Sequence, residues 1–106
     1  MLDQRVPDLN AAVERSHGGI ATIWEYNSSL SELSIRISWV GTSENIHLIC
    51  NGCLRIEATT GWSDVNLEYK CSETDEFRLI DKQAQFLVLC KSIRVFMNVE
   101  PRFLTQ

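Results

Sequence analysis

The sequence has no long apolar run and contains little proline or glycine. Two prolines and five glycines occur among 106 residues, a composition that excludes collagen-like and low-complexity chains. No apolar run approaches the ~20 residues that a membrane-spanning helix needs, so we expect no membrane insertion. Residues 1–7 lack the charged and then apolar segments of a secretory signal. We therefore expect a cytoplasmic chain whose four cysteines are reduced.

Positive charge is also scarce. Ten Lys and Arg stand against 14 Asp and Glu, for a formal net charge of −4. Without a Lys/Arg cluster the chain lacks the charge that neutralises phosphates, so nucleic acid is not an expected partner. The phosphate-binding loop, the dinucleotide-binding loop, the nucleophile elbow and the paired-histidine zinc motif are also absent. The absence of these motifs argues only against the enzyme classes that use them. Whether the chain is an enzyme stays open, and we favour a chain without catalytic function and with no cofactor.

What the sequence does contain is repeated alternation of apolar and polar residues. Such alternation is typical of half-buried β-strands. It recurs in eight segments, at residues 20–26, 33–39, 46–48, 54–58, 65–69, 77–80, 85–90 and 93–99. The pattern predicts an all-β, mainly antiparallel fold, a β-sandwich or a partly open barrel of about eight strands.

The N-terminal part differs from this pattern. Leu9, Ala12 and Val13 form a narrow apolar stripe at helical spacing, and Gly18–Gly19 supplies a stop. A short helix over 7–16 is therefore expected to cover an open end or edge of the sheets. We predict a single domain over 1–106, with this helix in a segment 1–19, a β-sheet core at 20–100 and a tail at 101–106.

One region has two interpretations. Residues 74–90 contain apolar positions at helical spacing, and Thr74 begins a segment that could cap a helix. However, residues 86–90 are apolar on both faces and are followed by the β-branched Ile93 and Val95. We predict two strands here, with a helix as the alternative.

Parity of the apolar residues suggests how neighbouring strands pair. A three-residue loop ending in Asn51–Gly52 would pair Leu48 with Leu54 and place Gly52 in the left-handed position of a bulged hairpin. In the same way, a turn at residues 42–43 would pair Trp39 with Ile46. The strands at 33–39, 46–48 and 54–58 would then form a meander with one apolar face.

The polar face of this meander supplies the candidate binding residues. The registers place Ser38, His47, Arg55 and Glu68 in one row across the strands. Such a row is typical of the solvated side of an antiparallel sheet. It would also serve as a hydrogen-bonding platform for a partner or a small anionic ligand, with Arg55 as the anchor.

His47, Cys50 and Cys53 are the one local group that suggests a metal or redox site. Zinc sites use such spacing, but they take four ligands, and no second pair follows. We therefore predict no metal and interpret these cysteines as small buried hydrophobes. The spacing alone does not decide whether Cys71 and Cys90 form a disulfide, although a cytoplasmic location argues against it.

Trp62 lies in a connection between strands, where the sheet does not need an aromatic residue. We interpret it as a lid on the core, with an exposed binding anchor as the alternative. The function that fits these features is a small non-catalytic module that acts through a protein partner or through self-association, because strand edges invite pairing. The alternatives are a small-ligand binder or enzyme that uses the polar row, and a metal or redox module.

Overall fold

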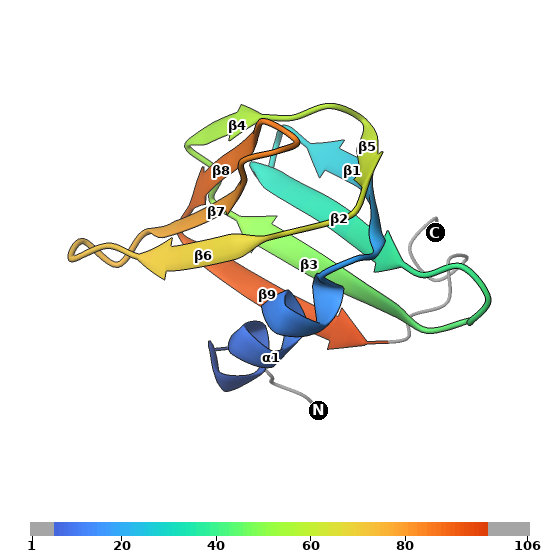
Figure 1. Cartoon of the computed structure of the whole chain (residues 1–106). Helices are drawn as coiled ribbons and strands as arrows, with labels where there is room; N and C mark the ends of the chain where they lie inside the picture. The colour runs from blue at the N-terminus through green and yellow to red at the C-terminus, as the bar shows by residue number, and fades with distance from the viewer. Residues whose placement is uncertain (1–5, 98–106) are drawn as a thin grey trace.

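The described part of the protein is a two-layer antiparallel β-sandwich with one helix (Figure 1). The computed structural model describes residues 6–97, with side chains from residue 9 onward. The predicted fold class is confirmed, although the described residues contain nine strands rather than about eight. The predicted tail at 101–106 and the end of the last predicted strand, at Val99, lie outside the described residues.

The first sheet has five strands in the order β5-β1-β2-β3-β9. Their bounds are β1 Ile20–Asn27, β2 Glu32–Ser38, β3 Asn45–Asn51, β5 Gly61–Ser63 and β9 Ser92–Met97. The second sheet has four strands in the order β4-β8-β7-β6. Their bounds are β4 Arg55–Glu57, β6 Glu68–Cys71, β7 Phe77–Asp81 and β8 Phe86–Cys90. All pairs within both sheets are antiparallel.

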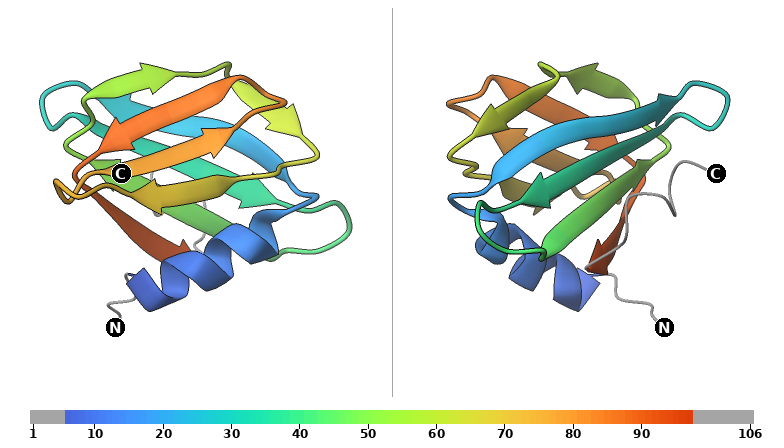
Figure 2. Two further views of the ribbon diagram at one scale, coloured as in Figure 1. Left: turned by 60° about the vertical axis from the view of Figure 1, so that its left-hand side comes forward. Right: turned by 90° about the vertical axis from the view of Figure 1, so that its right-hand side faces the viewer.

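The helix α1, Val6–Ser16, lies along the open side of the sandwich and packs next to β9 (Figure 2). Its buried stripe is the predicted one, because Leu9, Ala12 and Val13 join the core between the sheets. An 11-residue helix is marginal in isolation, so this packing holds it in place. Within residues 6–97 no helix has the length and apolar character to cross a bilayer.

The two strands predicted over residues 77–90 are present as β7 and β8, and the helical alternative for this region is wrong. Both strands place their apolar residues between the sheets. Leu79 pairs with Val88, and both side chains are fully buried. The turn between the strands ends at Gln85, whose φ is 57°.

The predicted β3–β4 hairpin is wrong. β3 pairs with β2 and β9, whereas β4 pairs with β8 in the other sheet. Gly52 has the expected left-handed φ of 65°, but the chain uses it to cross between sheets rather than to reverse within one. Leu54 is bonded to the second sheet, since its N–H donates to the carbonyl of Leu89 at 2.7 Å. A left-handed glycine at this position is compatible with a hairpin and with a crossover between sheets. The chain crosses over because the edge of β3 is paired with β9.

Two other expectations need correction. β2 and β3 do pair, but Ile46 lies opposite Ile37 rather than Trp39. The shift is two residues, which leaves each side chain on its predicted face. The strand predicted at 65–69 begins at Glu68, and β5 is an additional strand. The buried Val65 instead bonds to the chain after the helix, its N–H donating to the carbonyl of Gly19 at 3.1 Å.

Candidate functional site

The predicted polar row does not form, because it depended on the β3–β4 hairpin. On β2 the residue opposite His47 is Arg36, and Ser38 lies opposite Asn45. Arg55 is on β4 and Glu68 is on β6, at the two edges of the other sheet. The structure therefore separates Ser38 and His47 from Arg55 and Glu68 by the thickness of the sandwich.

His47 is sealed rather than available for binding. Its side chain has no exposed surface, and the Trp24 ring stands edge-on to it with a centroid distance of 5.8 Å. The guanidinium of Arg36 lies over that same Trp24 ring, 5.2 Å from its centroid. Among the described residues neither ring nitrogen of His47 has a hydrogen-bond partner. Burial, and next the charge of Arg36, lower the pKa of His47 from 6.5 to about 4, so the ring is neutral at pH 7 and packs as an aromatic.

The thiols near this strand belong to the core. Cys50 and Cys90 are fully buried and hydrogen-bond each other, and this bond together with burial raises the pKa of Cys50. Cys53 is half-buried, and its thiol donates to the carbonyl of Cys50 at 3.3 Å. Burial is also the main cause that raises the pKa of Cys53 to about 11. The raised pKa makes the thiols of Cys50 and Cys53 poor nucleophiles, whereas the hydrogen bond with Cys50 lowers the pKa of Cys90, so burial alone shields the Cys90 thiol from reagents.

These positions do not assemble the metal group suggested by the spacing. Cys50 points into the core, and His47, an odd number of residues away on an extended strand, points to the opposite face. Among residues 6–97 no cluster of three or more His, Cys, Asp or Glu side chains is placed to hold a metal ion. All four cysteines are described and free. Cys71 and Cys90 lie in one cross-strand row with Phe77 of β7 between them.

Trp62 is a lid on the core, as the sequence predicts. It is only partly exposed and packs on the core, with its ring centroid 4.8 Å from that of Phe86. Its indole Nε1–H donates to the carboxylate of Asp81 at 2.8 Å. Asp81 is buried and accepts a second bond from the backbone N–H of Asn66, also at 2.8 Å. Sequence reasoning missed Asp81, although an Asp that opens a strand-to-strand turn is a recognisable signal.

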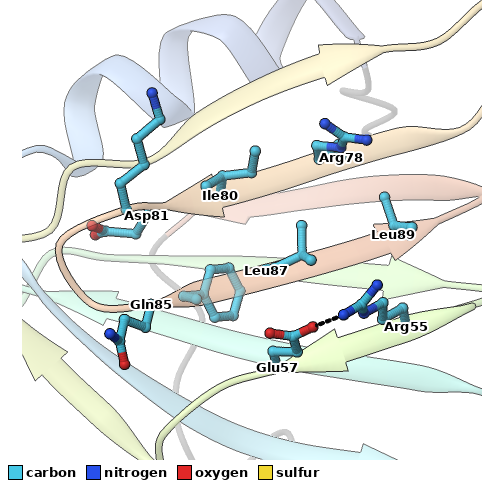
Figure 3. A pocket seen from close by; sticks show the side chains of 10 residues that line it. Arg55, Glu57, Arg78, Ile80, Asp81, Gln85, Leu87 and Leu89 are labelled. Carbon is cyan, nitrogen blue, oxygen red and sulfur yellow. Dashed lines mark ion pairs between the residues drawn. The ribbon is translucent and has the colours of Figure 1, made fainter.

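A hollow of the described surface lies on the outer face of the second sheet. It has a volume of about 590 Å³. Figure 3 shows Leu87 and Leu89 of β8 at its centre, with Ile80 and Arg78 of β7 on one side and β4 on the other. A smaller hollow of about 290 Å³ adjoins it and shares Arg78 and Leu89. The floor is therefore aliphatic, and it is half-buried rather than covered.

Cross-strand register arranges this face in two neighbouring rows. We call the first the acidic row, because a glutamate ends it at each side, and the second the basic row. The acidic row consists of Glu68, Ile80, Leu87 and Glu57, and the basic row of Lys70, Arg78, Leu89 and Arg55. Two of the predicted site residues, Glu68 and Arg55, thus share a face after all, but in different rows and at opposite edges.

This face also concentrates positive charge. With Lys82 at its margin, it carries four of the eight Lys and Arg residues found between positions 6 and 97. Arg55 pairs with Glu57 of its own strand. Among the described residues, Arg78, Lys70 and Lys82 form no ion pair. Unpaired cations around an aliphatic floor can bind carboxylates and apolar side chains together.

No protein-family model, curated protein or solved structure matches this chain.

Proposed function

We propose that the chain is a non-catalytic interaction module that binds a protein partner, a second copy of itself included, through the outer face of the four-stranded sheet. The observation that supports it most directly is the aliphatic floor of Ile80, Leu87 and Leu89 between charged rows. The solvated face of an antiparallel sheet usually carries polar residues at such central positions. Three adjacent aliphatic residues in the middle of an otherwise charged face are typical of an interface centre with a polar rim.

The composition of the face favours protein over nucleic acid. Single-stranded nucleic acids bind on exposed aromatic platforms, where bases stack. Here the floor is aliphatic, and the aromatic ring at the hollow, Phe86, is buried to 1% exposure. The net charge of −4 also opposes long-range attraction of a polyanion. Aliphatic anchors beside arginines instead match the side chains of another protein.

A charged substitution at the floor tests the proposal. Leu89→Asp places a carboxylate at the centre of the face, whereas Val40→Asp places one at a position that is 89% exposed in the connection between β2 and β3. We expect Leu89→Asp to abolish retention of the partner on immobilised protein, and Val40→Asp to leave retention unchanged. A circular dichroism melt of each variant verifies folding. Equal retention by both folded variants would contradict the use of this face.

A small anionic ligand is the second candidate, and the size of the hollow supports it. The volume of about 590 Å³ falls within the ~300–1,000 Å³ of ordinary ligand pockets. Arg78 and Lys82 at its margin could hold a carboxylate or phosphate. Native mass spectrometry of freshly purified protein distinguishes this candidate, since a bound small molecule adds mass that Arg78→Ala should remove. A protein without added mass favours the interaction module.

A further inference from the structure

We infer that the outer face of the four-stranded sheet is self-complementary and pairs with the same face of a second copy. The inference deepens the proposed function by naming the partner, and it rests on that function. It derives from the two rows described above, whose members alternate along each strand. On β4, Glu57 belongs to the acidic row and Arg55 to the basic row. On β6, Glu68 and Lys70 stand in the same relation.

The symmetry of a two-copy complex uses this arrangement directly. Homodimers have twofold axes, and each copy contributes the same patch. We consider an axis that lies between the two faces, crosses the strands and runs between the two rows. A half-turn about this axis sets the acidic row of one copy over the basic row of the other, strand over strand. The two rows are ~7 Å apart, because this is the spacing of residues two apart along a strand, and the axis passes midway between them.

The resulting contacts are complementary at both edges and at the centre. Glu68 lies over Lys70 of the second copy, and Glu57 over Arg55 of the second copy. At the centre, Leu87 meets Leu89 of the second copy, so that aliphatic side chains cover the floor. The twofold axis repeats every contact, which gives four ion pairs around a leucine cluster. Stacked sheets cross at about 30°, and the long side chains of the edge residues can span the resulting offset.

Arg78 is the residue without a direct counterpart. It lies over Ile80 of the second copy, where its aliphatic stem can pack. Its guanidinium is then one strand away from Glu68 of the second copy, a separation of ~5 Å between neighbouring strands. Arg78, which forms no ion pair in the described part of the chain, thereby gains a carboxylate.

The size of the face sets the strength of the complex. Four strands at ~4.8 Å spacing and about five residues at ~3.4 Å give a footprint of roughly 300 Å². Stable complexes bury about 800 Å² on each partner. The pairing is therefore weak and reversible, and its exposed ion pairs make it sensitive to salt.

Charge reversal of one row at a time tests the pairing. In Arg55→Glu/Lys70→Glu the ends of both rows are negative, and in Glu57→Lys/Glu68→Lys the ends of both rows are positive. We expect wild-type protein to dimerise with rising concentration in sedimentation velocity, and each variant alone to remain monomeric where wild type is half dimeric. An equimolar mixture of the two variants should recover the dimer, because every edge contact is then attractive. All four positions are exposed, and thermal melts verify that both variants fold.

The outcomes separate this inference from the proposed function. Wild type that stays monomeric at every concentration overturns self-pairing. So does a dimer that both variants form as well as wild type does, or a mixture that fails to associate. If wild type is monomeric and Leu89→Asp still loses a retained protein, the face binds a different partner and only the self-pairing is wrong. If neither association depends on this face, both proposals fail.

Discussion

The indole nitrogen of Trp62 and the carboxylate of Asp81 lie 2.8 Å apart and join the two sheets. Trp62 belongs to β5 of the first sheet, and Asp81 ends β7 of the second. The bond is partly buried, and Asp81 itself is 1% exposed. This carboxylate therefore holds the lid over the core, and its other oxygen accepts from the backbone N–H of Ala84 in the turn after β7 at 3.4 Å.

Removing this carboxylate should destabilise the protein strongly. Asp81→Ala leaves the Trp62 indole N–H and the Asn66 backbone N–H without their acceptor. An unsatisfied buried donor costs ~1–3 kcal/mol, so we expect a loss of about 3 kcal/mol in the free energy of unfolding, measured by urea denaturation. Glu73→Ala, in the exposed turn before β7, is the control and should change it by less than ~1 kcal/mol. A loss for Asp81→Ala no larger than that of the control would show that water replaces the carboxylate.

Burial of His47 should make stability fall in mild acid. The pKa of His47 is about 4 in the folded protein, whereas an unburied histidine has a pKa of 6.5. As the pH falls below 6.5, the unfolded chain therefore binds a proton at His47 before the folded protein does. Stability is therefore lost as the pH falls from 6.5 towards 4, by at most ~3 kcal/mol at ~1.4 kcal/mol per pKa unit. Urea denaturation of wild type and His47→Leu at several pH values measures the difference. If the two proteins lose stability in parallel over this range, His47 does not titrate as proposed.

Two glycines allow backbone strain to be separated from steric overlap. Gly52 and Gly41 both have left-handed φ, 65° and 87°, but a Cβ at Gly52 would lie 2.7 Å from Cγ of Lys91, whereas Gly41 has nothing within 4 Å. We expect Gly41→Ala to cost about 1 kcal/mol from φ alone. Gly52→Ala should cost more, and Lys91→Gly in the same chain should remove the excess. An equal cost for both alanine variants would mean that the Lys91 side chain moves aside freely.

The four thiols should differ widely in reactivity. Cys71 is exposed, Cys53 half-buried, and Cys50 and Cys90 buried. Under native conditions we expect an alkylating reagent to modify Cys71 first and Cys53 slowly. Cys50 and Cys90 should react only after denaturation, because alkylation needs an accessible thiolate. Peptide mass spectrometry after timed alkylation measures the order. Early labelling of Cys90 would indicate that the sandwich opens locally.

Sequence patterns predicted the faces of this fold better than the partners of its strands. The alternation in β2 and β3 correctly placed Ile37 and Ile46 in the core. A shift by two residues keeps every side chain on its face, so parity alone could not tell whether Ile46 pairs with Ile37 or with Trp39. The partner of β3 was equally undetermined, because β9 lies about 45 residues further along the chain. Long-range pairing of this kind leaves no local signal.

The candidate site shows the same division. Arg55 and Glu68 were correctly placed on an outward face, because both alternate with core residues. His47 was predicted on a polar face and is instead completely buried. The Trp24 ring of β1 stands against the His47 ring of β3, across the intervening β2, and no periodicity in the sequence indicates a contact between strands that are not neighbours. The aliphatic centre of the second sheet could not be predicted from the sequence, because it depends on which strands are neighbours in that sheet and on the register of their pairing.

The order of strands in the first sheet has a consequence for synthesis on the ribosome. β1, β2 and β3 are synthesised one after another and can pair early. The second edge of β3 stays unpaired until β9 is made, and residues 92–97 of β9 come last among the described strands. Until then a buried strand presents an unpaired backbone, which is a site for pairing with other chains. We expect nascent chains that end before residue 92 to bind chaperones or aggregate, and folding to complete only once β9 has left the exit tunnel.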